Sequence, residues 1–312
     1  STAGVRVFGR LFCICATRRT IGYNRAMIYI QNSDFNLKKI AESGQCFRMN
    51  PNATGGYTLV ALGRVLRLRE TPQCCELDCS QADFDALWRD YFDLKRDYAG
   101  IRASADPSDA FLNRACDYGR GIRMLRQDPW EMLITFILSQ RKNIPAIRYC
   151  VEALCSRYAE PIESAGERFF AFPSAERLAA QDERCLLDCS LGYRAKYVSA
   201  AARLVAGGAL DLIQISNLPD DELIQALLAV PGVGEKVANC VMLFGYHRLG
   251  RFPRDVWINR IVEHEYGGVF PLERYPGIAG ALQQYMFFYA RSEEYANCSK
   301  RSKVESDSDL SV

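Results

Sequence analysis

The stretch "LLAVPGVGEKVANC", residues 227–240, decides the fold of this chain. An apolar run leads into a Pro-Gly-x-Gly break, and a second apolar stretch opens with Lys236 and has few polar neighbours on any helical face. The run "DELIQALLAV" predicts one helix and "EKVANCVMLFGY" a second that begins at once. Because glycine adopts left-handed dihedral angles without strain, Gly232 and Gly234 suit the tight turn between them. The pattern therefore predicts a helix-hairpin-helix.

A helix-hairpin-helix suits a grip on a DNA backbone. Glycines let a phosphate approach the turn closely, and the unpaired N–H groups at the start of the second helix bind it without reading the base sequence. Gly232 and Gly234 are therefore predicted DNA contacts. Taken alone, the motif is also compatible with a plain packing turn between two helices.

A carboxylate follows Lys236 at a distance of nineteen residues. In "FPRDVWINRIVEHEYG", Asp255 stands at the predicted head of a helix, where backbone N–H groups and the helix dipole keep a carboxylate ionised. A lysine amine is a nucleophile when neutral, and an apolar site disfavours its ammonium form. Lys236 is therefore a candidate nucleophile, and Asp255 a candidate to stabilise positive charge that develops at the atom attacked. The alternative is a structural lysine that extends its ammonium group to solvent.

The composition leaves few other chemistries open. The 312 residues are 49% hydrophobic, carry a formal net charge of +2 and contain no apolar run long enough for a membrane span. The thirteen cysteines form no Cys-x-x-Cys pair, and there are two histidines, so we expect no metal and no cofactor. "CCELDC" (74–79) and "CLLDC" (185–189) are interpreted as small buried hydrophobes. We expect a soluble, reduced, cytoplasmic protein, associated with the nucleoid if the source is bacterial.

The chain changes character once. Residues 27–80 contain short β-rich runs, "MIYIQNSDF", "QCFRM" and "GYTLVALGRVLRLRE", the last with Leu62 and Gly63 as a hairpin turn. From Ser80 onward the patterns are helical, for example "DPWEMLITFILSQ" with Asp128 as N-cap and Pro129 in the first turn. We predict an α+β protein with a small antiparallel sheet domain (27–105) and a larger helical domain (106–292). Residues 1–26 and 293–312 are expected to be disordered extensions.

Four stretches carry a resemblance to a known family: "SGQCFRM", "DPWEMLITFILSQ", "LGYRAKYVSAAAR", and "LLAVPGVGEKVANC" with the downstream "FPRDVW". Together they resemble the 8-oxoguanine DNA glycosylase branch of the helix-hairpin-helix glycosylase superfamily. The resemblance implies a monomer that removes 8-oxoguanine from damaged double-stranded DNA in base excision repair. Relatives that use water as the nucleophile lack the lysine, so Lys236 and Asp255 imply a glycosylase that is also an AP lyase.

The resemblance also implies a pocket for an extruded base. Cys240 and Phe287 would sandwich the base, and Gln283 would read its pairing edge. Cys240 lies one helical turn after Lys236, so both side chains project from the same helical face. The backbone carbonyl of Gly44 would accept a hydrogen bond from N7–H of 8-oxoguanine, a donor that guanine lacks.

The expected contacts to the duplex match less completely. Arg141 and Asn143 stand in the turn where the family has an asparagine-rich plug, while Tyr193 and Arg194 match the residues that wedge the duplex and contact the opposite base. The family's second arginine for the opposite base falls at Ala146, and Met49 replaces an aromatic residue. Lesion recognition is thus better retained than recognition of the opposite base.

Two other functions remain open from the sequence. One is a monofunctional 3-methyladenine-type DNA glycosylase, which would form no covalent intermediate with DNA. The other is a non-catalytic helix-hairpin-helix protein that binds DNA and leaves a lesion-bearing strand intact.

Overall fold

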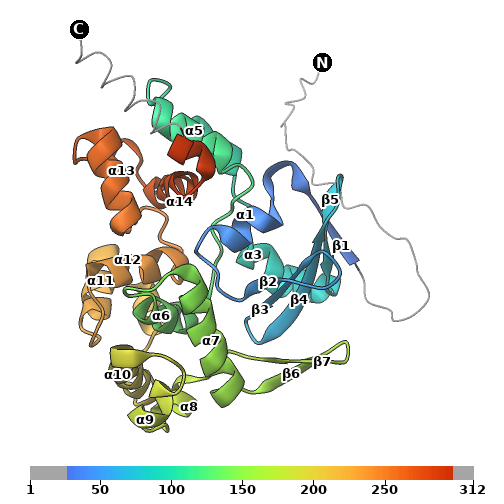
Figure 1. Cartoon of the computed structure of the whole chain (residues 1–312), viewed down its shortest axis with the longest axis vertical. Coiled ribbons are helices and arrows are strands. Elements are labelled where there is room, and N and C mark those ends of the chain that lie inside the picture. Colours follow the sequence, from blue (N-terminus) through green and yellow to red (C-terminus); the bar gives the residue numbers. More distant parts are fainter. Residues whose placement is uncertain (1–26, 298–312) are drawn as a thin grey trace, which may run out of the picture.

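The structure is a computed structural model that describes residues 27–297, so the predicted extension 1–26 and the end of the predicted tail lie outside the described residues. Its first part is an antiparallel sheet with strand order β1-β5-β4-β3-β2, which Figure 1 shows beside a larger group of helices. The strands are β1 (Met27–Gln31), β2 (Met49–Pro51), β3 (Tyr57–Ala61), β4 (Arg64–Glu70) and β5 (Cys74–Asp78). Helix α1 (Leu37–Glu42) separates β1 from β2.

The predicted hairpin at Leu62 and Gly63 is confirmed. These two residues join β3 to β4 with φ angles of 52° and 68°, the left-handed values that a two-residue hairpin turn needs at both central positions. The run "QCFRM" was predicted as a strand, but only Met49 enters β2, and the residues before it form a buried loop. Strand β5 uses "CCELD", in which Cys75 is buried between alternating half-buried residues.

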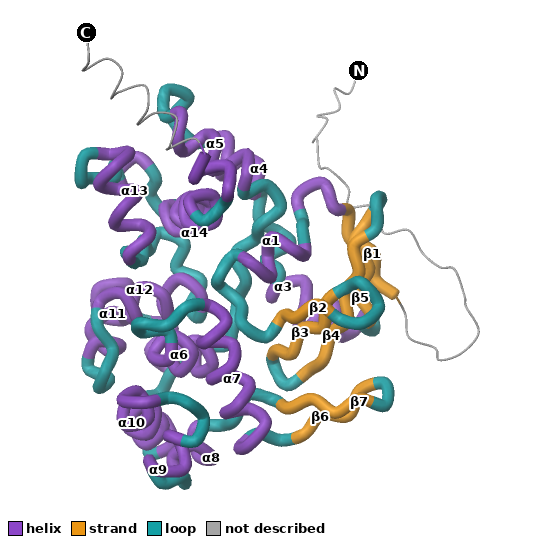
Figure 2. Tube along the Cα trace, viewed as in Figure 1, coloured by secondary structure: helices purple, strands orange, loops and turns teal. Residues whose placement is uncertain are grey.

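After Ser80 the chain is mostly helical, as expected (Figure 2). Ser80 and Asp128 cap α2 and α6 by accepting hydrogen bonds from Asp83 N and Glu131 N. A π-helical turn, Phe84–Trp88, joins α2 to α3. The helices that follow the sheet are α2 (Gln81–Asp83), α3 (Arg89–Tyr91), α4 (Tyr98–Ala103), α5 (Ala110–Tyr118), α6 (Pro129–Leu138), α7 (Ile144–Tyr158), α8 (Ala175–Ala179), α9 (Glu183–Leu187), α10 (Ala195–Ala206), α11 (Asp220–Leu228), α12 (Glu235–Phe244), α13 (Val256–Tyr266) and α14 (Ala279–Ala290).

A second hairpin interrupts the helices, contrary to prediction. Strands β6 (Pro161–Ser164) and β7 (Glu167–Phe170) pair antiparallel across a turn in which Ala165 and Gly166 both have positive φ angles. Alanine is an unusual residue for such a turn, so no clear hairpin signal marks this stretch of the chain. The hairpin lies beside the sheet because Arg67 of β4 donates to the hydroxyl and carbonyl oxygens of Ser164.

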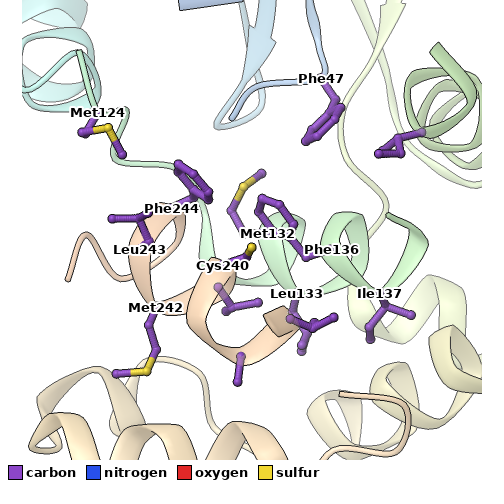
Figure 3. Packing of buried hydrophobic residues seen from close by; sticks show 14 of the residues in the cluster. Phe47, Met124, Met132, Leu133, Phe136, Ile137, Cys240, Met242, Leu243 and Phe244 are labelled. Atoms are coloured by element: carbon purple, nitrogen blue, oxygen red, sulfur yellow. The ribbon is translucent and has the colours of Figure 1, made fainter. Parts of the chain in front are cut away.

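Two hydrophobic cores fill the molecule. One lies under the sheet around Trp88 and Phe92, and the other joins the helices from Tyr98 to Ala290. Figure 3 shows part of the second core, where Cys240 of α12 faces Met132 and Phe136 of α6. The cysteines interpreted as buried hydrophobes follow this pattern at Cys75, Cys79 and Cys189, whereas Cys185 is exposed. The domain division at residue 105 stays a prediction.

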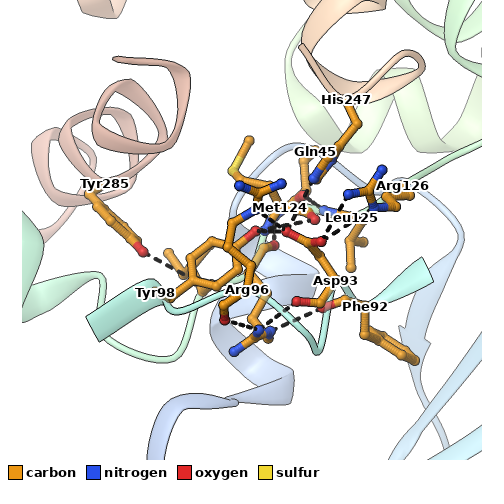
Figure 4. A network of polar contacts seen from close by, with 12 residues as sticks. Gln45, Phe92, Asp93, Arg96, Tyr98, Met124, Leu125, Arg126, His247 and Tyr285 are labelled. Atoms are coloured by element: carbon orange, nitrogen blue, oxygen red, sulfur yellow. Dashed lines mark hydrogen bonds and ion pairs between the residues drawn. The ribbon is translucent and has the colours of Figure 1, made fainter. Parts of the chain in front are cut away.

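A buried polar network joins the sheet domain to the loop between α12 and α13 (Figure 4). The Asp93 carboxylate lies 3.1 Å from Nε2 of His247 and also accepts from Arg96, Tyr98 and Arg126. Burial alone would raise the pKa of Asp93, but the hydrogen bond and charge of His247, together with Arg96, outweigh it and lower that pKa. Burial also lowers the pKa of His247 below its ordinary value of 6.5. The loop that leads to Asp255 is thereby tied to the sheet domain.

The network predicts a pH dependence of stability. Because the pKa of His247 is lowered in the folded state, the unfolded chain takes up a proton at a higher pH than the folded protein does. The contribution of His247 is therefore complete above pH 6.5 and is lost as the pH falls through the lowered pKa. We expect His247→Gln to flatten the fall in the free energy of unfolding below pH 6.5. Urea titrations at several pH values measure this slope, and His264→Gln, at the exposed second histidine, controls for the loss of an imidazole as such.

Candidate active site

The predicted helix-hairpin-helix is present as α11, a turn, and α12. Gly232 has a φ angle of 82°, and a Cβ atom there would stand 2.3 Å from the ring of Tyr197, so both the dihedral angle and the packing require glycine. Gly234 was expected to be left-handed as well, but its φ angle is −100° and it is the N-cap of α12. A Cβ atom on Gly234 would meet no atom within 4 Å, so the absent side chain leaves open space at the head of α12.

Lys236 lies in the first turn of α12 and is half-buried. Its Nζ donates to the hydroxyl of Ser139 over 3.2 Å and stands 5.2 Å from the centre of the Phe136 ring. Both contacts come from the C-terminal end of α6. The lysine is therefore held against α6, beside one polar partner and an aromatic face.

Asp255 is the N-cap of α13, as predicted. Its Oδ1 accepts a hydrogen bond of 2.8 Å from Ile258 N, and its side chain is half-buried. The first N–H groups of a helix and the positive end of its dipole stabilise a carboxylate in this position. The Asp255 carboxylate is thus held at the N-terminal end of α13.

Cys240 links the lysine and the aspartate. Burial raises the pKa of the Cys240 thiol, while the charge of Lys236 and a hydrogen bond from it lower that pKa and the charge of Asp255 raises it. The thiol is 3% exposed and faces the core beside Met132 and Phe136 (Figure 3). The charges of Lys236 on α12 and of Asp255 at the head of α13 therefore both act on the Cys240 thiol.

Helix α14 contributes an unpaired acceptor. Gln283 is 5% exposed, and its Oε1 has no hydrogen-bond partner among the described residues. A buried acceptor without a donor costs free energy unless a ligand or water supplies one. Gln283 is therefore a suitable group for reading donors on a base, the role implied for it from the sequence.

Gly44 packs directly against Phe287. Its φ angle is 82°, and a Cβ atom at this position would lie 3.0 Å from Cε1 of Phe287 and 3.3 Å from Cδ1 of Ile144. A side chain would have to displace the aromatic ring, so glycine is required here. The structure thus places the loop between α1 and β2, called the Gly44 loop below, beside the aromatic residue predicted to stack on the base.

The predicted duplex contacts divide into exposed and buried groups. Tyr193 is 49% exposed, whereas Arg194 is 6% exposed and stacks 4.4 Å from the Tyr193 ring centre. The Arg194 guanidinium donates to the carbonyl oxygens of Gln140 and Leu191, so it supports the turn before α7. Asn143 caps α7 by accepting from Ala146 N over 2.9 Å. Arg141 is exposed at the tip of this turn with a φ angle of 53°.

Sequence reasoning missed three residues of this region. The first, Ser139, is the hydrogen-bond partner of Lys236. The second, Arg291, stands 5.0 Å from the Phe287 ring centre, and its charge interacts with that of Asp255. Burial lowers the pKa of Arg291, and Asp255 opposes that shift. Arg291 follows Phe287 by one helical turn, a spacing that could have indicated it. The third, Gln284, contacts the Gly44 loop.

Other features of the described chain do not compete with this site. Cavities of about 530 Å³ and 370 Å³ lie between the sheet and the β6–β7 hairpin, and neither is lined by a lysine. Residues 27–297 contain no group of three His, Cys, Asp or Glu side chains placed to hold a metal ion. Within the same residues, no helix has the length and apolar character needed to cross a membrane.

Comparisons with known proteins agree with this arrangement. Residues 27–133 match the model of the 8-oxoguanine DNA glycosylase N-terminal domain, and residues 134–268 match that of the HhH-GPD superfamily of base excision DNA repair proteins. A probable N-glycosylase/DNA lyase from Methanothermobacter thermautotrophicus is 30% identical over 229 residues, which cover 64% of this chain and 72% of the relative.

Two solved structures share the whole architecture. MBOgg1, in complex with a low affinity DNA ligand, is 38% identical with a TM-score of 0.81, and the match covers 88% of this chain and 99% of that one. The Clostridium acetobutylicum 8-oxoguanine glycosylase/lyase, in complex with double-stranded DNA containing cytosine opposite 8-oxoguanine, is 32% identical with a TM-score of 0.80 over 86% and 95% of the two chains. With its sheet domain and its helix-hairpin-helix, this chain belongs to the 8-oxoguanine DNA glycosylase family of the HhH-GPD superfamily.

Proposed function

We propose that this protein removes 8-oxoguanine from double-stranded DNA and then cleaves the strand at the resulting abasic site, with Lys236 as the nucleophile. The observation that carries the proposal is Lys236 in the first turn of α12, with its Nζ 3.2 Å from the Ser139 hydroxyl and its charge, like that of the N-cap Asp255, acting on the buried Cys240 thiol. Relatives named as N-glycosylase/DNA lyases share this fold, which favours a bifunctional enzyme over a monofunctional glycosylase or a passive DNA-binding protein.

The chemistry follows from the positions of the two charged groups. The neutral Nζ of Lys236 attacks the anomeric carbon C1′, and the C1′–N9 bond breaks, so the base leaves with the bonding electrons. The Asp255 carboxylate stabilises positive charge that develops on the sugar. The C1′–O4′ bond then breaks as a proton passes from Nζ to O4′, which opens the sugar to a protonated Schiff base between C1′ and Nζ. Removal of a proton from C2′ expels the 3′ phosphate and cuts the strand.

Lesion recognition is proposed to use two acceptors and two surfaces. Gly44 would offer its carbonyl oxygen to N7–H, and the unpaired Oε1 of Gln283 would accept from the N–H groups of the pairing edge. Phe287 and Cys240 would hold the faces of the base. Guanine presents a lone pair at N7, so two acceptors would oppose each other and the undamaged base would be disfavoured.

The direct test is incubation with an 8-oxoguanine duplex in the presence of borohydride. We expect strand cleavage without the reductant and a covalent protein–DNA adduct with it, because borohydride reduces the Schiff base to a stable amine. Base release without an adduct would indicate a monofunctional glycosylase, and binding without base release would indicate a passive DNA-binding protein. Either result would overturn the proposal.

The site also predicts a weak preference for the base opposite the lesion. Ala146 replaces the expected arginine, and the nearby Arg148 donates to the Ala41 carbonyl oxygen over 2.7 Å and so is engaged within the protein. Arg194 is likewise engaged, with two carbonyl oxygens. The loss of one charge-assisted donor to a base edge removes about 1–3 kcal/mol of discrimination.

We therefore expect excision rates opposite A, G or T to lie within a modest factor of the rate opposite C. Ala146→Arg should sharpen the preference for C, and Ser156→Arg, at an exposed position near the other end of α7, is the matched control that should not. Single-turnover rates on four duplexes that differ in the opposite base measure the effect. A strong preference for C in the unmodified enzyme would contradict this prediction.

The proposed substrate also suggests where and how the enzyme acts. We propose that it works as a monomer, because all proposed catalytic and base-binding residues lie in one chain, and that it acts in the cytoplasm, at the nucleoid if the source is bacterial, because its proposed substrate is DNA. Sedimentation of the protein with and without an 8-oxoguanine duplex would test the monomer, since a dimeric complex on one lesion would contradict it.

A further inference from the structure

From Ile40 near the end of α1 to Gln45 in the loop that follows, side chains donate to every backbone carbonyl except that of Gly44. Among residues 27–297, no group donates to the carbonyl of Gly44, although its neighbours on both sides are occupied. The acceptors and their side-chain donors are Ile40 with Ser43, Ala41 with Arg148, Glu42 with Arg291, Ser43 with Gln284, and Gln45 with Gln127. The Gly44 carbonyl is thus the one left open in a run of satisfied acceptors.

Two buried amides hold the carbonyls immediately before and after Gly44. Nε2 of Gln284 donates to Ser43 O, and Nε2 of Gln127 donates to Gln45 O over 2.7 Å. Gln284 is 2% exposed and Gln127 is 6% exposed. Hydrogen bonds between such buried groups are costly to break, since the partner left behind is unsatisfied.

The side chain of Gln45 fixes the same loop from within. Its Nε2 donates to Ser43 Oγ over 3.0 Å and to Arg123 O over 2.9 Å, and its Oε1 accepts from Leu125 N over 2.8 Å. Figure 4 shows Gln45 beside Leu125 and the network at the domain junction. The loop is therefore connected to the segment 123–127 as well as to α14.

We propose that Gln284 and Gln127 are positioning residues for lesion selectivity, which set the place and direction of the Gly44 carbonyl oxygen relative to the base pocket. The inference rests on the proposed function, in which that carbonyl accepts from N7–H. Gln284 follows Gln283 on α14, so one of two consecutive glutamines would contact the base edge and the other holds the Gly44 loop. One rigid helix then fixes the spacing between the two groups that recognise the lesion.

The physical reason is the narrow range of a hydrogen bond. An N–H to O hydrogen bond needs a distance of about 2.7–3.2 Å and a nearly linear donor. A displacement of the loop by less than 1 Å would therefore weaken the bond from N7–H, and the carbonyl would no longer distinguish 8-oxoguanine from guanine, which has a lone pair at N7. A glycine with positive φ has wide conformational freedom and cannot hold its carbonyl direction by sterics alone. Bonds to the carbonyls on both sides supply that restraint.

The test separates base recognition from lysine chemistry. Gln284→Met keeps the side-chain volume and removes the donor, and we measure single-turnover excision of 8-oxoguanine alongside cleavage of a preformed abasic duplex. We expect excision to fall by about ten- to hundredfold, as for a misplaced recognition group, while abasic-site cleavage stays unchanged because it needs no base contact. Gln127→Met should act in the same direction. Met286→Leu, an equally buried change on α14, is the matched control for both activities.

A modified base tests the route of the effect. A duplex with the 7-deaza analogue of 8-oxoguanine carries C–H in place of N7–H, so the Gly44 carbonyl has no donor to accept from. On this analogue, excision by Gln284→Met should be little slower than excision by the unmodified enzyme. Such non-additivity indicates that the base change and the glutamine change affect the same interaction. An equal additional loss on both bases would overturn the inference.

The remaining outcomes are also decisive. Unchanged excision by both glutamine variants, or parallel losses of excision and abasic-site cleavage, would reject a positioning role while leaving the proposed function in place. A wild-type enzyme that cleaves abasic sites and does not release 8-oxoguanine would instead overturn the proposed function, and this inference with it.

Discussion

Lys236→Gln is expected to abolish strand cleavage and borohydride trapping while binding to duplex DNA remains. Glutamine retains a polar head group that can still donate to Ser139, and the hairpin glycines are untouched, so the fold and the DNA grip should persist. An amide nitrogen, however, is not a nucleophile and cannot form a Schiff base. Because the lysine supplies both the attack and the imine, the expected loss is complete rather than partial.

The experiment compares trapping, cleavage and affinity for an uncleavable abasic analogue. Lys95→Gln is the control, since Lys95 is an exposed lysine paired with Asp90 in the sheet domain. Trapping that persists in Lys236→Gln would remove Lys236 from the nucleophile role. A large loss of DNA affinity would instead assign the lysine to binding, the alternative that the sequence left open.

Local signals explain why much of the site could be predicted. Ser80, Asp128 and Asp255 all cap helices because a short oxygen-bearing side chain reaches N–H groups two or three residues ahead, an effect contained within one turn. The break at Gly232 is similarly local, although its steric reason, the Tyr197 ring, comes from another helix. Residue type and spacing therefore sufficed for the helix-hairpin-helix and for the helix cap at Asp255, while the catalytic roles of Lys236 and Asp255 stay predictions.

The long-range contacts could not be predicted in this way. His247 and Asp93 are separated by 154 residues, and Gln284 and Ser43 by 241, so no local pattern links them. Arg194 has the sequence signature of a DNA contact, yet its burial against Gln140 depends on how η3 (Gly192–Arg194) packs on the turn before α7. A sequence indicates which side chains carry chemistry more readily than it indicates which ones hold them in place.

Asp255→Asn is the second change with a large expected effect. Asparagine can accept the hydrogen bond from Ile258 N, so the cap of α13 should survive, and the change removes the negative charge. Loss of a preorganised electrostatic partner to a developing charge costs about 10²–10³ in rate. We expect single-turnover excision of 8-oxoguanine to slow by that order, with affinity for the lesion duplex largely retained.

A matched cap distinguishes charge from structure in this variant. Asp97 caps α4 in the same way, through a 2.9 Å bond from Gly100 N, and lies on an exposed surface. Asp97→Asn should therefore change thermal stability as much as Asp255→Asn does and leave excision unaffected. If Asp255→Asn lowered affinity and excision by the same factor, the aspartate would be structural. A loss of rate without a loss of affinity would instead show that the charge of Asp255 stabilises the transition state. The charge of Arg291, which interacts with Asp255, would then modulate that stabilisation.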